Sequence, residues 1–428
     1  MVLSALVLVL PLMMGHRNFM TLSATSLVMV LGALLAAWVA VLPFGRPLRW
    51  PGAGWLAFAA FLSLVVLVQV LPSSLLARLL GPYPDAFWAH PGFEPRTWSP
   101  NPAATLSGWA VFVALFLIAW LVSVLRSGYR HALWLVIAVS AVFQSVYGLL
   151  AHAGGAETIF GIWERNNPNF VHGSFSNRNL FAGYLALTWP LTVAVWWLRD
   201  TPVLSALPRE LKVAGSVICG AIVGAALIGS ASRLGSAAGL AGMFTALVLW
   251  TRYRGHISGG VVWPVYLAAF AALIAATWYG LTPLAERLVV TSVEEMRFEL
   301  FSLMLTEFPP RWWLTGVGLG GFEAAFKLIQ VTDASRWVDY AHNDLLQWLI
   351  EMGLVGLVLL VWVCVALWRN ARLEAETLPL YAGLVALCLV ALGDFSWHIP
   401  GTQVVLAIYI GALLRQKIPR KRSVRAGR

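Results

Sequence analysis

The sequence predicts an all-α integral membrane protein with about twelve transmembrane helices and a large, partly helical outer loop before the tenth span. Hydrophobic residues make up 60% of the 428-residue chain, and the mean hydropathy is +0.78. Only 11% of the residues are charged, whereas a soluble domain carries about 25%. The apolar residues also gather in runs of the length that crosses ~30 Å of hydrocarbon. We therefore treat residues 1–428 as a single polytopic membrane domain.

The apolar runs give the expected spans in order. A transmembrane helix needs roughly 20 apolar residues, and the twelve candidates lie near 1–15, 19–43, 53–72, 108–125, 132–152, 179–198, 213–232, 235–250, 261–281, 344–368, 377–395 and 402–415. The first run lacks a basic segment and a cleavage site, so we expect a retained span rather than a signal peptide. Only SRLGS separates the seventh run from the eighth, and the count depends on reading them as two helices.

Lys and Arg predict the orientation of the chain. With both termini inside, most of the 29 Lys and Arg residues fall in inner loops, as the positive-inside rule requires. The stretch RQKIPRKRSVRAGR holds seven of them and no acid. A basic tail of this kind, 416–428, is expected on the cytoplasmic side against anionic lipid rather than on nucleic acid.

Three outer loops are long enough to carry function: 73–107, 153–178 and 282–343. In the third, Ser292 and Glu295 fit a capping box that opens a helix of about 293–307, which Pro309 and Pro310 end. The same loop contains GVGLGG, 316–321, which lacks the strand and helix of a dinucleotide site and reads as a flexible outer loop. Aromatic residues expected on this side, which could stack on sugar rings, are Trp98, Trp312, Trp313 and Trp397.

Charged residues gather at the predicted outer edge of the spans, where they are rare and usually functional. They are Arg178, Arg233, Arg287, Arg297, His342, Asp344, Asp394 and His398. Arginine pairs with phosphate through two parallel hydrogen bonds, so several arginines near one point indicate an anion site. Ser230, Ser232, Gly229 and Gly235 would let backbone amides approach it. Each arginine could instead be solvated or reach to the interface, which is the favoured interpretation for Arg311, Lys327 and Arg336.

The stretch YAHNDLLQWLIEMGLVG, 340–356, places polar groups where the tenth span begins. Asn343 or Asp344 can cap this helix, and the positive end of the helix favours a neutral imidazole at His342 that can accept a proton. Asp344, Gln347 and Glu351 share one helix face, which could line a polar cleft. The alternative is structural: a satisfied histidine, a capping aspartate, and a Glu351 paired with an arginine. Asp394 could likewise hold an arginine or touch a sugar hydroxyl.

Five ordered stretches resemble the O-antigen ligase and polymerase superfamily. They are GSFSNRNLFAGYLALTWPL, IGSASRLGSAAG, PPRWWLTGVGLGGF, YAHNDLLQWLIEMGLVG and DFSWHIPG. The resemblance implies a bacterial inner-membrane glycosyltransferase that works at its periplasmic face, with the 282–343 loop in the periplasm. The donor would be a glycan on undecaprenyl diphosphate, and the acceptor lipid A core, another polysaccharide or a protein. Neither a metal nor a cofactor is expected.

The resemblance also implies roles for particular residues. His342 takes the place of the essential loop histidine, Arg233 that of the arginine in the S-R-x-G stretch, and Arg178 that of the arginine opening the preceding span. Arg297 or Arg287 would supply a further loop arginine on the diphosphate, and Asn343, Asp344, Glu351, Asp394 and His398 would support the site. A transporter or flippase of an anionic lipid or small anion is the alternative, and a structural subunit of a glycan-export complex is a second.

Overall fold

The computed structural model describes residues 1–13, 19–41, 51–80, 96–165, 168–198, 202–254, 292–329 and 338–415. These residues form helices almost throughout, as expected, and the strands among them are the short pair β1 (Thr158–Ile159) and β2 (Trp163–Glu164). The predicted ninth span, 261–281, lies outside the described residues, as do Arg287, Arg336 and the basic tail 416–428.

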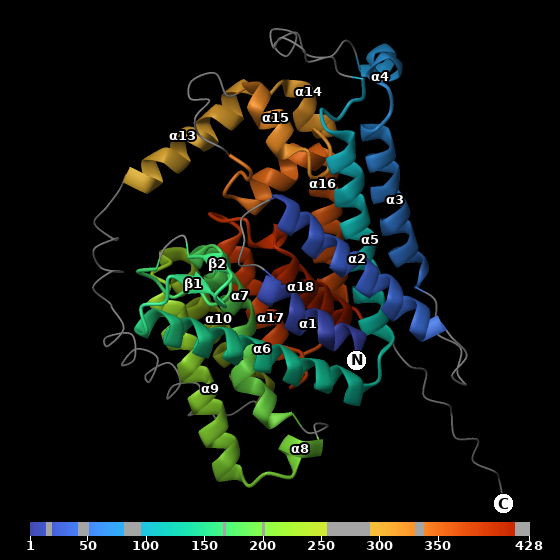
Figure 1. The fold of residues 1–428 in the computed structure, drawn as a ribbon. Coiled ribbons are helices and arrows are strands. Elements are labelled where there is room, and N and C mark those ends of the chain that lie inside the picture. The colour runs from blue at the N-terminus through green and yellow to red at the C-terminus, as the bar shows by residue number, and fades with distance from the viewer. Residues whose placement is uncertain are drawn as a thin grey trace, which may run out of the picture.

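Eleven of the twelve predicted spans coincide with a helix of the structure (Figure 1). The helices are α1 (Val2–Leu12), α2 (Phe19–Val41), α3 (Ala53–Gln69), α5 (Pro102–Val124), α6 (Ser127–Ala153), α7 (Arg178–Ala194), α9 (Arg209–Gly229), α10 (Arg233–Arg254), α16 (Asp344–Arg369), α17 (Leu378–Val390) and α18 (Pro400–Leu413). The turn Ser230–Ser232 separates α9 from α10, which confirms that the SRLGS region joins two helices.

Six of these helices, α5, α6, α7, α9, α10 and α16, are long and apolar enough to cross a membrane. Others are shorter. At 1.5 Å per residue, α1, α17 and α18 measure about 16–21 Å, less than the ~30 Å of a bilayer core. A helical membrane protein is therefore confirmed, while the number of crossings stays a prediction.

Helix α7 lies at the centre of the bundle. It contacts α6, α9, α10 and α17, and 83% of its apolar window is buried. The exterior is apolar as well: Leu357, Val361 and Val365 follow one face of α16 and are 47%, 53% and 39% exposed. A hydrophobic exterior around a packed core is what a chain surrounded by lipid requires.

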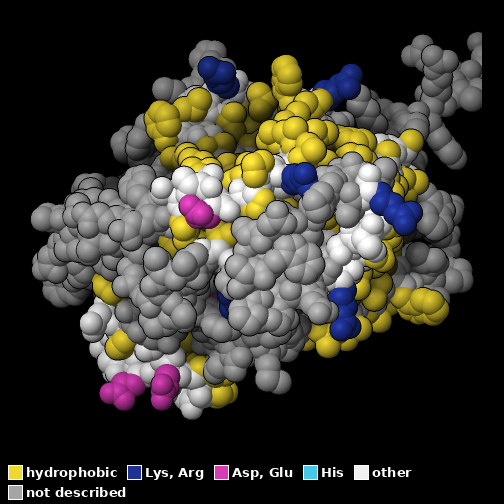
Figure 2. Space-filling model, turned by 90° about the horizontal axis from the view of Figure 1, so that it is seen from above, with side chains coloured by type: hydrophobic (Ala, Val, Ile, Leu, Met, Phe, Trp, Pro, Cys, Tyr) yellow, Lys and Arg dark blue, Asp and Glu magenta, His cyan; other side chains and the backbone are white. Residues whose placement is uncertain are grey.

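The large outer loop folds into three helices at the top of Figure 1: α13 (Ser292–Glu307), α14 (Pro310–Thr315) and α15 (Phe322–Ile329). The predicted helix of about 293–307 is confirmed, and Pro310 opens the next helix in the first-turn position that proline favours. Seen from this end, hydrophobic side chains cover much of the described surface and Lys and Arg are spread singly (Figure 2).

Two of the outer tryptophans belong to the hydrophobic core under α13, α14 and α15. Trp98 and Trp312 are each 1% exposed, and the indole of Trp98 donates to Thr315 Oγ1 at 2.9 Å. The expectation that they stack on sugar rings is therefore wrong, because no face of either ring is open. Short helix α4 (Ser73–Leu80) and the early start of α5 at Pro102 also occupy part of the expected 73–107 loop.

Helix α16 is broken at Gly353, in its third turn. Gly353 has φ 62° and ψ −160°, a conformation that only glycine adopts readily. The break frees backbone carbonyls that a membrane cannot hydrate. The GVGLGG segment supplies their donors: Val317 N lies 2.9 Å from Ile350 O, and Gly318 N lies 3.0 Å from Glu351 O.

GVGLGG is thus not a free outer loop but the partner of the break in α16. Gly316, Gly318 and Gly320 all have positive φ, and a Cβ at Gly316 would collide with the Glu351 carbonyl. Gln69 of α3 joins the two segments, since its amide donates to Glu351 O at 2.9 Å and accepts from Leu319 N at 3.2 Å. The glycines permit this close docking.

Candidate functional site

Several helix ends meet on one side of the bundle. Residues 182 and 183 of α7 are the meeting point: Gly235, in the first turn of α10, packs against Ala182, and Gly183 packs against Ser396 of the short helix η4 (Ser396–His398). Arg178 and Arg233 open α7 and α10. At 1.5 Å per residue each lies within about 8 Å, along its own helix, of this contact.

The first turn of α16 joins the same side through the chain that follows α17. Asn343 caps α16 by accepting from Leu346 N at 2.9 Å, which confirms one of the two predicted caps. Its amide also donates to Leu392 O at 3.0 Å. The backbone amide of Asp344 donates to the carbonyls of Ala391 and Asp394. The α16 N-terminus is thereby bound to the turn before η4.

Asp344 and His398 form the most direct polar pair of the site. Asp344 is fully buried; its Oδ1 lies 2.7 Å from His398 Nδ1, and its Oδ2 accepts from Trp397 N at 2.9 Å. Burial opposes protonation of His398, but the hydrogen bond and the charge of Asp344 outweigh it, and the pKa of this imidazole is raised. Asp394, 4% exposed, accepts from Phe395 N at 2.9 Å.

His342 occupies a strained position beside this pair. Its φ is 51°, which is uncommon outside glycine and clusters at functional sites. The imidazole meets the Phe395 ring edge to face at 5.1 Å, and Phe395 stacks on Tyr340 at 4.2 Å. The structure therefore brings His342, Asn343, Asp344, Asp394 and His398 together, although 54 residues separate Asp344 from His398.

Glu351 has a structural surrounding. It is 1% exposed; its Oε2 accepts from Gly320 N at 2.8 Å and its Oε1 from Gln347 Nε2 at 3.1 Å. Gln347 in turn accepts from Ala341 N at 3.0 Å. The shared face of Asp344, Gln347 and Glu351 does not line an open cleft, because all three side chains are buried against protein groups.

Arg178 stands at the start of α7 on an aromatic support. Its guanidinium carbon lies 4.1 Å from the centre of the Phe170 ring, within the range of a cation–π contact. Its Nη1 atom is buried and has no hydrogen-bond partner among the described residues. Asn177 caps the helix through its contact with Asn179 N at 2.8 Å. The guanidinium of Arg178 is therefore held against the Phe170 ring, and one of its buried donors has no partner in the described part of the chain.

Arg233 follows a second strained turn. Ala231 has φ 50°, and the flanking serines bond within the turn: Ser230 Oγ accepts from Ser232 N at 3.2 Å, and Ser232 Oγ accepts from Gly235 N at 3.4 Å. These two amides, expected to approach an anion, therefore already have partners. His342 and Ala231 are alike in that each precedes a helix whose first turn carries a predicted site residue.

The structure gives fewer contacts for the remaining predicted residues. Arg297 lies on α13, and Arg287 lies outside the described residues. Lys327 pairs with Glu323 at 2.7 Å on the surface, in keeping with a solvated role. Among the described residues no three His, Cys, Asp or Glu side chains gather closely enough to hold a metal ion.

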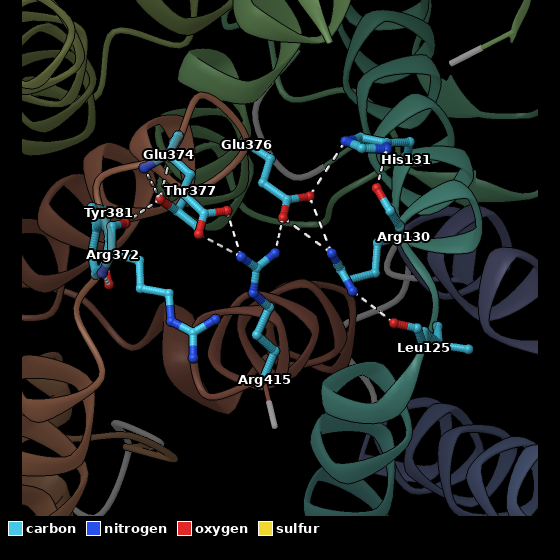
Figure 3. Close-up of polar contacts among 10 residues, drawn as sticks. Leu125, Arg130, His131, Arg372, Glu374, Glu376, Thr377, Tyr381 and Arg415 are labelled. Carbon is cyan, nitrogen blue, oxygen red and sulfur yellow. Dashed lines mark hydrogen bonds and ion pairs between the residues drawn. The ribbon is translucent and has the colours of Figure 1, made fainter. Parts of the chain in front are cut away.

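A second polar cluster lies where α6 and α17 begin and α18 ends, and Figure 3 shows its contacts. Arg130 is 6% exposed and donates to Glu376 at 3.0 Å, and Glu376 also contacts His131 and Arg415. Arg415 reaches Glu374 at 2.5 Å as well. Since the chain runs from Asp344 to this end through α16 and returns through α17, the cluster is separated from His342 by the length of the bundle.

The fold and the site define a polytopic helical membrane protein with cationic and imidazole groups at helix N-termini on one side. Residues 217–361, roughly a third of the chain, match the model of the O-antigen ligase family. The match confirms the resemblance to the O-antigen ligase and polymerase superfamily and indicates glycan transfer as the general activity. It includes Arg233, His342, Asp344 and Glu351, whereas Arg178, Asp394 and His398 lie outside it. A search of curated proteins finds no match.

Proposed function

We propose that this protein transfers a glycan from undecaprenyl diphosphate to an acceptor hydroxyl at the periplasmic face of a bacterial inner membrane. The observation that carries the proposal is the meeting of three helix starts, those of α7, α10 and α16, around residues 182–183 and η4. These starts carry Arg178, Arg233 and His342. Helix N-termini favour anions, and arginine matches phosphate geometry.

The chemistry assigns one role to each group. The acceptor oxygen attacks the anomeric carbon, the bond from that carbon to the phosphate oxygen breaks, and the diphosphate leaves on its lipid. Arg178, Arg233 and a loop arginine such as Arg297 bind the diphosphate of the donor and also stabilise the charge that builds on the leaving group, a contribution of several kcal/mol in such sites. His342 takes the proton of the hydroxyl, which is typically worth roughly 10²–10⁴-fold in rate. Inversion is expected because the displacement is direct.

The pair of Asp344 and His398 supports this step by fixing the position of His342. Asp344 binds both the η4 backbone and the His398 ring, and Phe395, from the same turn, contacts His342. His342 and its polar neighbours lie at a helix start because the donor's phosphates lie at the membrane surface while its polyprenyl tail stays in lipid. The acceptor is lipid A core, a growing polysaccharide or a protein.

The orientation rests on where the cations lie. Arg130 and Arg415 belong to the end of the bundle opposite His342, together with the start of α9 at Arg209 and the end of α16 at Arg369. The positive-inside rule assigns that end to the cytoplasm. With both termini there, the site faces the periplasm.

A transporter or flippase of an anionic lipid is the second candidate, and the break in α16 is the observation that favours it. Transporters bind substrates at broken helices near the midplane, and Gly353 lies about 14 Å along the helix from Asp344. Here, however, the freed carbonyls of Ile350 and Glu351 are bound by the GVGLGG segment. The break is thus filled by protein, which favours transfer chemistry over transport.

The test is glycan transfer by the purified protein in lipid vesicles that contain a glycan on undecaprenyl diphosphate. Lipid A core, an oligosaccharide and a protein acceptor are supplied in parallel, and His342→Ala and Arg233→Ala are compared with the wild type. Transfer to one acceptor that both substitutions abolish supports the proposal and identifies the acceptor class. Movement of the donor across the bilayer without transfer to any acceptor would replace the enzyme with the transporter.

A further inference from the structure

We propose that Arg165 is a positioning residue for Arg178, acting through the segment 170–172, and this inference rests on the proposed function. Sequence reasoning missed Arg165, because WERNNPNFVHG shows no pattern that separates it from a solvated loop arginine. In the structure it is 7% exposed, although it lies in a loop after α6. A buried guanidinium needs a reason, because burial of a charge without compensation is unfavourable.

Within the residues that the structure describes, the guanidinium of Arg165 makes four hydrogen bonds, all to uncharged acceptors. Nε lies 2.9 Å from His172 Nε2, Nη1 lies 3.2 Å from Ala151 O and 2.8 Å from Ala156 O, and Nη2 lies 3.0 Å from Phe170 O. Arg130, the other buried arginine in the described part of the chain, is bound by the carboxylate of Glu376 instead. Arg165 therefore uses its planar fork as a geometric clamp between the end of α6 and the segment 170–172.

His172 completes the clamp. It is 1% exposed, and its Nδ1 lies 2.6 Å from the Phe175 carbonyl. That contact requires a proton on Nδ1, which leaves Nε2 as the acceptor for Arg165. Burial, together with the charge of Arg165, lowers the pKa of His172 to about 4, so the neutral ring that this geometry needs is the form present at neutral pH.

The clamped segment contacts Arg178 at the start of α7 and the last residue of α9, four residues before Arg233. The Phe170 ring supports the Arg178 guanidinium at 4.1 Å, while the carbonyl of the same residue is held by Arg165. The amide of Val171 donates to Gly229 O at 3.1 Å, at the turn that leads to Arg233. Ser174 fixes the following residues through Gln144 at 2.9 Å. A displacement of Phe170 would therefore change the direction in which Arg178 presents its donors.

The experiment is a double-mutant cycle on Arg165 and Arg178, read as the donor KM and kcat of glycan transfer by the full-length protein in vesicles. Arg165→Gln is expected to raise the donor KM about tenfold and to change kcat less, because it removes binding made before the reaction. In an Arg178→Gln background the same substitution should change the KM less than twofold, since residues that act through one another are not additive.

Three variants separate the effect of position from the effects of charge and of stability. Arg165→Lys keeps the charge but not the fork, so it should raise the KM as Arg165→Gln does. Phe170→Leu keeps the carbonyl that Arg165 binds but removes the ring under Arg178, and should raise the KM in the same direction. Arg130→Gln, at matched burial on the opposite side, should lower the melting temperature without changing the donor KM of the folded protein.

The outcomes distinguish this inference from the proposed function. Equal effects of Arg165→Gln with and without Arg178, or full rescue by Arg165→Lys, would overturn the positioning role while leaving glycan transfer in place. An Arg178→Gln variant with the donor KM of the wild type would instead contradict the role of Arg178 on the diphosphate.

Discussion

His398 Nδ1 lies 2.7 Å from Asp344 Oδ1, so that η4, between α17 and α18, is joined to the first residue of α16. The carboxylate is fully buried and also accepts from the Trp397 amide. One side chain therefore fixes both the η4 backbone and the imidazole. An aspartate that binds Nδ1 holds a histidine in one tautomer. The two histidines of the site therefore differ in their surroundings: His398 is bound by Asp344, and His342 contacts the Phe395 ring.

The first prediction separates the two histidines. His342→Asn should lower kcat roughly 10²–10⁴-fold, the range for loss of a general base. His398→Asn should lower it about tenfold, because it loosens η4 and the Phe395 ring that contacts His342. Steady-state transfer rates at saturating donor measure both. A loss at His398 that equals the loss at His342 would make His398 the base.

The second prediction concerns the break in α16. A Cβ at Gly353 would collide with the Leu314 carbonyl at a positive φ. Gly353→Ala should therefore destabilise the protein by at least about 1–3 kcal/mol, the range for backbone strain. Thermal unfolding in detergent measures it. Gly54→Ala is the matched control, because its Cβ would meet nothing within 4 Å; equal melting temperatures of the two variants would contradict the account.

The third prediction concerns the ionic cluster far from the site (Figure 3). Glu376→Ala leaves the buried Arg130 without its carboxylate, and removal of one partner of a buried pair costs about 3–5 kcal/mol. The low end is expected, because the Glu376 side chain is 13% exposed. Lys327→Ala, which breaks an exposed pair, should have little effect. Thermal unfolding measures both, and a glutamate variant as stable as Lys327→Ala would show that the cluster contributes nothing.

The fourth prediction is a pH dependence from His172. Its folded-state pKa of about 4 lies below the ordinary value of 6.5. The folded state therefore binds this proton less well than the unfolded state, and stability falls as the pH drops from about 6.5 toward 4. Unfolding curves at several pH values measure the slope. His172→Gln should flatten it in this window, and an unchanged slope would show that other groups cause it.

The periodic, apolar parts of the fold could be predicted from the sequence, and the contacts across the bundle could not. Runs of about 20 apolar residues located α5 and α10, and the capping residues with Pro309 and Pro310 located α13. The break at Gly353 stayed hidden because a glycine inside an apolar run is common in membrane helices. GVGLGG was misread for a different reason: its partner carbonyls come from a segment about 30 residues further along the chain.

The candidate site was predicted in part. The sequence placed four polar residues at one predicted membrane edge, where such costly groups usually share a function. The structure brings the four together: His342, Asp344, Asp394 and His398. The Asp344–His398 bond itself depends on how α16, α17 and α18 pack, which no local pattern encodes. Arg165 was missed because its burial arises from a fold of the loop around it.

The central claim is that Arg178 and Arg233 bind the diphosphate while His342 acts only on the acceptor proton. The most direct test is equilibrium binding of undecaprenyl diphosphate, without glycan or acceptor, to the protein in vesicles. Arg233→Gln should weaken binding by at least about tenfold, as loss of a charge-assisted hydrogen bond implies. His342→Asn should leave it within twofold of the wild type. Unchanged binding by Arg233→Gln, or equal weakening by His342→Asn, would contradict the account.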